Sequence, residues 1–321
     1  LKETKLLRYG SSQTAFCTGS SDIDIAVFTE YDVNEVNMII AIYNLLCKIS
    51  TENNLGWQIR KITDTRVPVI KMKVPFEGVI IPIDISLNNI QAVTNTQLIN
   101  TYALIDPRCV ELVKLVKFWT KTQGIRNEKG DYLDTYAYTN MAINLLQILE
   151  QPILPNLTDT PEKHIVFWKG QEFNIAFKGD LEQIRKEFTM NTNNPQTVFS
   201  LFYQFVEFYG EIFPKLNATV SVGTGCLISR EESYSTNEVT PHFYLISIED
   251  PLERSHNLGE TLHNLKTEDP NMRFPERVEK FETAFRATLD FLREVVQKAS
   301  PITTEDKEKF RKLFVDSSDK K

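Results

Sequence analysis

Residues 10–24 read GSSQTAFCTGSSDID, and this stretch carries the clearest chemical signal in the chain. At its end, Asp22 and Asp24 alternate with apolar residues, a period-two pattern that predicts a β-strand. Both carboxylates therefore leave the same face of the strand, where they repel each other unless cations lie between them. At its start, Gly10 permits a tight turn, and Ser11 adds a hydroxyl to the backbone N–H groups that such a turn offers to phosphate oxygens. The stretch predicts a corner that binds metal and phosphate.

The sequence around this stretch predicts a small mixed α/β unit. A short strand is expected over residues 5–9, and the apolar spacing between Val36 and Cys47 predicts a helix. Two further strands are expected in VPVIKMKV (67–74) and GVIIPIDISL (78–87), because apolar and polar residues alternate in both. The first hundred residues or so thus form one unit, in which two strands carry acidic residues on their polar faces.

Asp84 supplies a third carboxylate for the predicted metal site. It lies on the polar face of the strand in residues 78–87, whose other face is apolar. Oxygen ligands suit Mg²⁺, and a two-metal site needs an acid from a second strand, so we expect Asp22, Asp24 and Asp84 to be catalytic and to bind Mg²⁺, with Mn²⁺ as the alternative ion. The competing interpretation is that the two aspartates only mark a strand edge or a cap. The Gly-Ser turn upstream and Asp84 downstream favour the metal site.

Helical periodicity dominates after Asn100. Helices are expected at about 107–123, 135–149, 198–210 and 276–297. Residues 151–196 are rich in Pro, Asn and Thr and predict loops with short elements, and residues 218–248 predict a loop and strands. A last short helix is expected at TTEDKEKF (303–310), capped by a Thr or Asp side chain. We therefore expect two domains, 1–100 and 101–321.

These motifs together resemble the DNA polymerase β superfamily of nucleotidyltransferases, and within it the terminal uridylyltransferases and cytoplasmic-type poly(A)/poly(U) polymerases. The resemblance covers nearly the whole chain. Its G-S…S-D-x-D pattern ends at Asp24, its third acid is Asp84, and its later segments match N-N…N-T, V-K-x-W-x-K, DTYAYTNMAINLL and D-P-x-x-x-x-H-N-x-G at residues 88–96, 116–121, 134–146 and 250–259. Ala15 and Glu260 depart from the pattern, which often has glycine and a basic residue there.

The resemblance implies an α+β fold: a small mixed α/β nucleotidyltransferase domain packed against a mainly helical central domain of the poly(A) polymerase-associated type, with a nucleotide cleft between them. It also implies which residues bind the nucleotide. They are Gly10, Ser11, Ser21, Asn89, Asn95, Thr96, Lys117, Lys121, Thr135, Tyr136, Asp250, Glu253 and His256.

Several of these residues receive a role from the resemblance and an alternative from the residue type. Lys117 and Lys121 are implied to hold the β- and γ-phosphates, although a lysine stripe with Lys114 is also typical of a solvated helix face. Tyr136 is implied to stack on the base, although it also suits a helical core. His256 is implied to donate to uracil O4, although an isolated histidine is more often structural.

Two further assignments stay open at this stage. Asn95 and Thr96 are implied to contact the ribose hydroxyls. A group of basic residues along one edge of the small sheet predicts either an RNA track or a solvated sheet edge. They are Arg60, Lys61, Arg66, Lys71 and Lys73.

Composition and charge limit the classes to which this protein can belong. Apolar residues make up 41% and charged residues 25%, the balance of a globular chain. No apolar run reaches the length of a membrane span, and the four cysteines form no C-x-x-C pair, so the sequence predicts no membrane helix, zinc knuckle or disulfide framework. We expect an intracellular, most readily cytoplasmic protein. The chain begins close to the motif, so a truncated leader leaves a mitochondrial or nuclear location open.

The expected function is template-independent addition of UMP from UTP to RNA 3′ ends by two-metal-ion catalysis, with release of pyrophosphate. One alternative is the same chemistry with ATP, as in a poly(A) polymerase. Another is a catalytically weak subunit of an RNA-processing complex. The net charge of −7 argues against strong autonomous RNA binding, which neutralisation of phosphates drives, so a protein partner is expected to supply RNA affinity.

Overall fold

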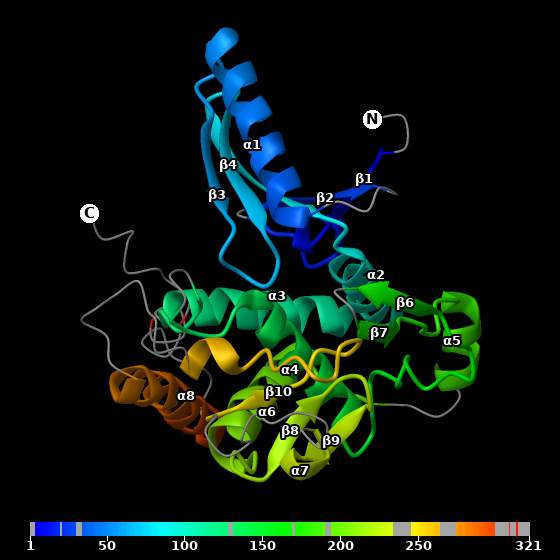
Figure 1. Cartoon of the computed structure of the whole chain (residues 1–321). Helices are drawn as coiled ribbons and strands as arrows, with labels where there is room; N and C mark the ends of the chain where they lie inside the picture. The colour runs from blue at the N-terminus through cyan, green and yellow to red at the C-terminus, as the bar shows by residue number, and fades with distance from the viewer. Residues whose placement is uncertain are drawn as a thin grey trace. The chain divides into compact units, whose positions relative to one another are not determined.

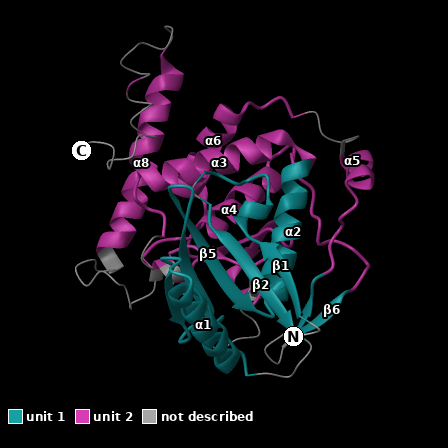
Figure 2. Cartoon of the chain, turned by 90° about the horizontal axis from the view of Figure 1, so that it is seen from above, with its two compact units in different colours: residues 1–104, 164–175 teal, residues 105–163, 176–321 magenta. Residues whose placement is uncertain are grey.

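The computed structural model describes residues 4–19, 21–29, 34–127, 131–168, 171–189, 194–233, 245–263 and 274–298, together with 308 and 313. The chain divides into two compact units (Figure 2). The first comprises Leu1–Leu104 and His164–Ile175, and the second comprises Ile105–Lys163 and Ala176–Lys321. The first unit thus ends close to residue 100 and also takes in a hairpin from the middle of the chain.

A five-stranded sheet forms the centre of the first unit (Figure 1). Its strand order is β1 (Thr4–Tyr9), β2 (Ile23–Thr29), β5 (Val79–Leu87), β4 (Val69–Phe76) and β3 (Gln58–Ile62). β2 and β5 are parallel, and the other neighbouring pairs are antiparallel. The four strands predicted at these places are confirmed. β3 was not predicted, because in QIRKI only Ile59 and Ile62 are apolar.

Helix α1 (Glu35–Glu52) covers one face of this sheet and confirms the predicted helix. Its side chain Ile39 packs against Ile70, Met72 and Leu87 from β4 and β5, and all four are buried. Asn34 caps the helix, because its side chain accepts a hydrogen bond from the N–H of Asn37. Since strand side chains alternate, the apolar contact with α1 leaves the polar side chains of β2, β4 and β5 on the opposite face.

Helix α2 (Ile90–Ile105) follows β5 and was not predicted. Asn88 turns the chain with a φ of 48°, and its side-chain oxygen accepts a hydrogen bond from the N–H of Thr29 on β2. The side chain of Asn89 then accepts from the N–H of Ala92 in the first turn. Polar and apolar residues are buried alike along α2, so its sequence lacks the contrast between faces that signals a helix.

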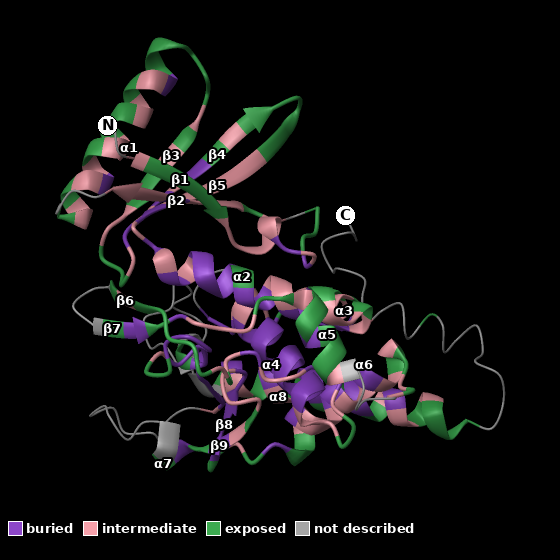
Figure 3. Cartoon of the chain, turned by 90° about the vertical axis from the view of Figure 1, so that its right-hand side faces the viewer, coloured by how far each residue is buried: buried purple, intermediate pink, exposed green. Residues whose placement is uncertain are grey.

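The second unit is mainly helical, as predicted. Helices α3 (Pro107–Thr122), α4 (Thr135–Ile148), α6 (Val198–Glu207) and α8 (Phe274–Gln297) confirm the four predicted helices. Trp119 of α3 lies at the core, with its ring centroid 4.9 Å from that of Phe285 on α8. Its indole N–H donates to Thr288 Oγ1 at 3.1 Å. α4 is buried along nearly its whole length (Figure 3).

A small sheet accompanies these helices. β8 (Ala218–Ser221) pairs with β9 (Cys226–Ser229) in an antiparallel manner and with β10 (Ser247–Ile248) in a parallel manner, which confirms strands in this region. The remaining elements are short: η1 (Ser11–Gln13), β6 (Ile165–Trp168), β7 (Gln171–Asn174), α5 (Leu181–Thr189), the π-helical turn η2 (Phe208–Ile212), α7 (Arg230–Ser233) and η4 (Glu260–His263). The predicted helix at 303–310 lies outside the described residues except for Glu308. Within the described residues, every helix is too short or too polar to cross a bilayer.

Candidate active site

One row of side chains crosses the polar face of the five-stranded sheet. Strand register pairs Tyr9 with Asp24, Asp24 with Asp84, Asp84 with Lys71, and Lys71 with Arg60. Residues directly opposite each other on neighbouring strands point to the same face, so these five side chains share one face. The row brings the carboxylates of β2 and β5 side by side and places a lysine next to them.

Gly10 allows the backbone to approach the carboxylate of Asp24. Its φ is 73°, and a Cβ built at this position would lie 2.0 Å from Asp24 Oδ2, so no other residue fits without displacement. The N–H of Gly10 donates to Thr96 Oγ1 at 2.8 Å, and this hydroxyl donates in turn to the carbonyl oxygen of Ala92 at 2.7 Å. Thr96 therefore holds the Gly10 turn from helix α2.

The loop between Gly10 and Asp22 is closed by its own hydrogen bonds. Ser11 begins the η1 turn, and its carbonyl oxygen accepts from the N–H and the hydroxyl of Thr14. The N–H of Ala15 donates to Asn100 Oδ1 at 3.0 Å. Ser21 Oγ accepts from the N–H of Thr18 at 3.0 Å, so the Ser21 side chain stabilises the turn that leads to Asp22.

The acidic side chains of this row repel one another, and the lysine attracts them. Burial, and after it the negative charges of Asp84 and Asp22, raise the pKa of Asp24 to about 7, while the positive charge of Lys71 acts in the opposite direction. The ammonium of Lys71 forms an ion pair with Asp84 Oδ2. A buried carboxylate beside two others is therefore stabilised in its charged form only when a cation is added next to it.

The donor set fits a hard divalent cation. Asp22, Asp24 and Asp84 supply only carboxylate oxygens, which are the ligands that Mg²⁺ takes together with phosphates. The close backbone of Gly10 and the raised pKa of Asp24 are consistent with a cation site at this end of β2. Within the residues that the structure describes, no three His, Cys, Asp or Glu side chains are already grouped as a metal site. In this arrangement Asp84 is bound to Lys71 instead.

The second unit holds the predicted residues of α3 and α4. The three lysines of α3 differ in burial: Lys114 is exposed, Lys121 is half-buried, and Lys117 is buried with 8% of its surface exposed. Tyr136 follows Thr135 at the start of α4 and is half-buried. Burial and the negative charge of Asp250 raise the pKa of the Tyr136 hydroxyl well above its usual value, so Asp250 lies near this ring.

Residues 250–256 form a closed loop, named here the DPLERSH loop. The N–H of Asp250 donates to the carbonyl oxygen of His256 at 2.9 Å, and the N–H of His256 donates to that of Glu253 at 2.8 Å. Asp250 Oδ1 accepts from the N–H groups of Leu252 and Glu253. His256 Nδ1 lies 4.0 Å from Asp250 Oδ2. The loop thus presents two buried acids, Asp250 and Glu253, and a partly exposed imidazole.

The structure therefore places the predicted residues in two groups, one in each unit. The first unit holds Gly10, Ser11, Ser21, Asp22, Asp24, Asp84, Asn89, Asn95 and Thr96, and the second holds Lys117, Lys121, Thr135, Tyr136, Asp250, Glu253 and His256. Sequence reasoning missed the contacts of Tyr9, whose hydroxyl lies 3.1 Å from Ser86 Oγ, and of Asn100. It named Lys71 only among the basic residues of an RNA track or a solvated sheet edge. Strand register is the signal that would have paired Lys71 with Asp84.

Comparison with known proteins identifies the family. Residues 1–104 match the model described as poly(A) RNA polymerase, mitochondrial-like, central palm domain, and residues 197–256 match the model described as Cid1 family poly A polymerase. The chain is 27% identical over 274 residues to terminal uridylyltransferase cid1 of Schizosaccharomyces pombe and 30% identical over 272 residues to human terminal uridylyltransferase 7. The chain belongs to the Cid1-type family of terminal uridylyltransferases and poly(A) RNA polymerases.

Similarity to other members of the Cid1-type family extends to poly(A) enzymes and to the fold. Poly(A) RNA polymerase cid11 of Schizosaccharomyces pombe is 26% identical over 268 residues. A structure of Cid1 poly(U) polymerase with MgGTP matches with a TM-score of 0.76 at 24% identity and covers 98% of this chain and 87% of that one. The chain spans 64% of the length of cid1 and 17% of that of terminal uridylyltransferase 7, so it corresponds to only part of either protein.

Proposed function

We propose that this chain transfers UMP from UTP to the 3′-hydroxyl of an RNA and releases pyrophosphate. In this reaction the 3′-oxygen forms a bond to the α-phosphorus, the bond between that phosphorus and the α–β bridging oxygen breaks, and the hydroxyl proton is lost. The observation that carries the proposal is the side-by-side placement of Asp24 and Asp84 with the Gly10 backbone against Asp24. Acids clustered in this way are costly to a scaffold that binds no cation.

The first unit supplies the catalytic carboxylates in this proposal. Asp22, Asp24 and Asp84 would hold Mg²⁺, which when bound lowers the pKa of a ligated hydroxyl and offsets the charge of a triphosphate. The raised pKa of Asp24 means that this carboxylate gains most from a nearby cation. Lys71 holds the carboxylate of Asp84 on the same face of the sheet. The Gly10–Ser11 turn offers backbone N–H groups to phosphate oxygens.

The second unit supplies nucleotide recognition in this proposal. Lys117 and Lys121 contact the phosphates, and the burial of Lys117 supports a role other than solvation of the helix surface. Tyr136 stacks on the base with its partly exposed ring, while Asn95 and Thr96 of the first unit contact the ribose. Residues 1–100 are thus proposed as the catalytic domain and residues 101–321 as the base-recognition domain.

UTP is proposed as the nucleotide on the basis of His256. This imidazole is partly exposed, and its Nδ1 lies 4.0 Å from Oδ2 of the buried Asp250. An exposed imidazole N–H can donate to uracil O4. Further support comes from the named relatives, of which several are terminal uridylyltransferases, and from a Cid1 structure of a histidine mutant with MgATP in work on UTP selectivity.

The decisive experiment offers one RNA primer and one nucleotide triphosphate at a time, with Mg²⁺ or with EDTA. We expect extension with UTP and Mg²⁺, slower extension with ATP, and none in EDTA. Asp24→Asn should abolish extension, whereas Asp64→Asn, an exposed residue of the same unit, should not change it. Faster extension with ATP than with UTP would replace the proposal by a poly(A) polymerase, an activity for which cid11 is named. Extension by Asp24→Asn at the original rate would refute the metal site.

RNA binding and location follow as lesser proposals. We propose that the 3′ end of an RNA is the acceptor, and that a protein partner adds affinity for the rest of the RNA because the chain carries a net charge of −7. A salt titration of primer binding, with and without a cell extract fractionated by size, tests this. Tight binding by the isolated chain at 150 mM salt, on the order of physiological ionic strength, would contradict the need for a partner.

A further inference from the structure

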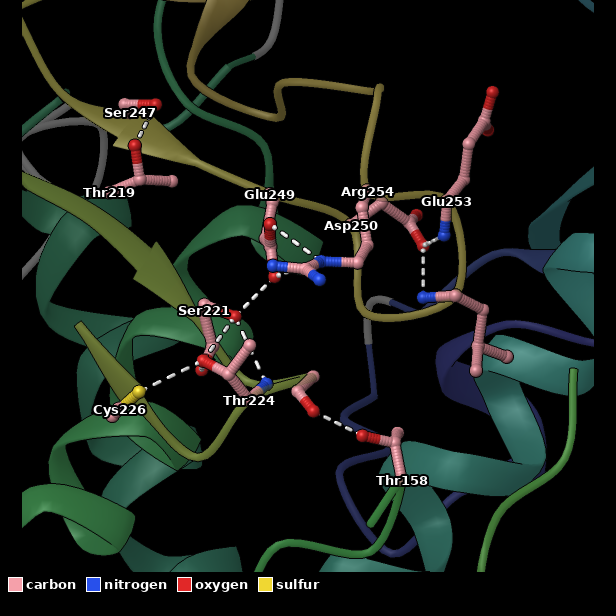
Figure 4. Close-up of polar contacts among 12 residues, drawn as sticks. Thr158, Thr219, Ser221, Thr224, Cys226, Ser247, Glu249, Asp250, Glu253 and Arg254 are labelled. Atoms are coloured by element: carbon pink, nitrogen blue, oxygen red, sulfur yellow. Dashed lines mark hydrogen bonds and ion pairs between the residues drawn. The ribbon is translucent and has the colours of Figure 1, made fainter. Parts of the chain in front are cut away.

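Glu249 is a buried carboxylate that the proposed reaction does not use. It lies between β10 and the DPLERSH loop, and 1% of its side chain is exposed. Arg254 reaches it from within that loop, with Nε 3.3 Å from both carboxylate oxygens, and 53% of the Arg254 side chain is exposed (Figure 4). A surface arginine is therefore tied to a carboxylate that water does not reach, which distinguishes this pair from an ordinary surface ion pair.

The ion pair spans the DPLERSH loop from its outer part to its base. The base is closed by the hydrogen bond between the N–H of Asp250 and the carbonyl oxygen of His256, and just outside it Glu249 bridges to Asn257. Arg254 lies in sequence between Glu253 and His256, two of the three loop residues assigned to the nucleotide. Its side chain crosses back to Glu249 and so fixes the backbone between these two positions.

The turn between β8 and β9 contacts Glu249 and the backbone of the same loop. Ser221 Oγ donates to Glu249, and it accepts from the N–H of Thr224 at 3.0 Å (Figure 4). A Cβ on Gly223 would lie 2.8 Å from the carbonyl oxygen of Pro251, so this turn packs directly against the loop backbone. Thr158 donates to the carbonyl oxygen of Gly223 and holds the turn in place. Glu249 thus joins the β8–β9 turn to Arg254.

We propose that Arg254 and Glu249 are positioning residues for base selection: their ion pair sets the places of Glu253 and His256 and thereby the preference for UTP over ATP. This inference rests on the proposed function, because it gives the ion pair a role at the same base site. Arg254 does not touch the base. Its effect passes through the loop backbone on either side of it.

The distances favour a bracing role over a direct one. Nε of Arg254 lies 3.3 Å from both oxygens of Glu249, so this edge of the guanidinium faces the base of the loop. In Figure 4 the side chain of Glu253 extends away from this pair. Without Arg254, the buried carboxylate of Glu249 loses a cationic partner, and such a loss drives the surroundings of a buried charge to rearrange.

The test compares Arg254→Met with a matched control, Arg293→Met. Arg293 also forms an ion pair with glutamates of the second unit, at 2.7 Å from Glu211 and 3.2 Å from Glu207, but it lies on α8 away from the loop. For each variant, kcat and KM are measured with UTP and with ATP on one primer. Amide hydrogen exchange of residues 250–256 is measured on the same proteins without nucleotide.

Arg254→Met should raise KM for UTP about tenfold with little change in kcat, which corresponds to the loss of one charge-assisted hydrogen bond. KM for ATP should change less, so the preference for UTP falls by a similar factor. Exchange in residues 250–256 should rise relative to Arg293→Met. Arg254→Lys should recover part of the preference because it restores the charge without the planar fork.

Two results would overturn the inference. One is a preference for UTP in Arg254→Met equal to that in Arg293→Met, and the other is unchanged exchange in residues 250–256. If the wild-type protein fails to extend RNA with any of the nucleotides, the proposed function is refuted instead. The exchange measurement still decides in that case whether Arg254 holds the loop, so the two failures are distinguishable.

Discussion

Replacement of Gly10 by alanine tests the predicted active site more sharply than removal of a carboxylate does. The added Cβ would lie 2.0 Å from Asp24 Oδ2, whereas real Cβ atoms stay at least 3.0 Å from such neighbours, so the carboxylate has to move by about 1 Å. A displacement of this size in a catalytic group reduces rate by roughly a hundredfold. The φ of 73° and ψ of −169° lie in a region that is essentially restricted to glycine, which adds a backbone penalty of about 1–3 kcal/mol for a residue with a Cβ.

Gly78 provides a control that separates these two effects. It also has a positive φ, 81°, and a Cβ there would meet nothing within 4 Å. Gly78→Ala should therefore also lose stability from the backbone, and it should keep its activity.

The assay for this pair is single-turnover extension of a labelled primer with UTP, read beside the thermal unfolding midpoint of each variant. We expect both midpoints to fall and only Gly10→Ala to lose rate. A rate for Gly10→Ala within about threefold of that for Gly78→Ala would refute the reasoning, because a displacement of the Asp24 carboxylate by that distance would then have no catalytic consequence.

Three other predictions follow from the site. The pKa of Asp24 is raised from 3.8 to about 7, so the folded protein keeps this proton to a higher pH than the unfolded chain does. In EDTA, the stability of the protein should therefore fall as the pH rises from about 4 to about 7. Asp24→Asn should remove that fall, as measured by a pH series of thermal unfolding midpoints. A midpoint difference independent of pH would contradict this. Lys117→Met should raise KM for UTP about tenfold, while the exposed Lys114→Met leaves it unchanged; equal effects would return both lysines to a solvated face. His256→Ala should bring the rates with UTP and ATP closer together, and an unaltered ratio would remove His256 from base selection.

The strands of the first unit could be predicted because burial on one face imposes period two on the sequence. That period also placed Asp84 on a polar face without knowledge of its neighbours. Its pairing with Asp24 could not be predicted, because the register between β2 and β5, which are separated by α1, β3 and β4, depends on packing rather than on local pattern. Its pairing with Lys71 lies across the β4–β5 hairpin, whose register depends on the turn at residues 77–78.

Helix α2 and the DPLERSH loop were beyond sequence reasoning for different reasons. α2 buries Gln91, Thr94 and Asn95 together with its apolar residues, so no hydrophobic stripe marks it. The loop could be found from its D-P…H-N-x-G pattern, but its ion pair could not. The partner of Arg254 is a buried carboxylate outside the turn, held by a hydroxyl from a strand about thirty residues earlier.

The fold also shows which of the basic residues near β3 and β4 share one face of the sheet. Arg60 and Lys71 lie in the same row as Asp24 and Asp84, and Lys73 shares their face because it stands two residues along the same strand. Lys61 points the other way, with Nζ 4.3 Å from the centroid of the Tyr43 ring on α1. Three cations on the face that also carries Asp24 and Asp84 suit the phosphates of an RNA, so we propose the RNA track rather than the solvated edge. The net charge of −7 therefore describes the chain as a whole and not this face of the sheet.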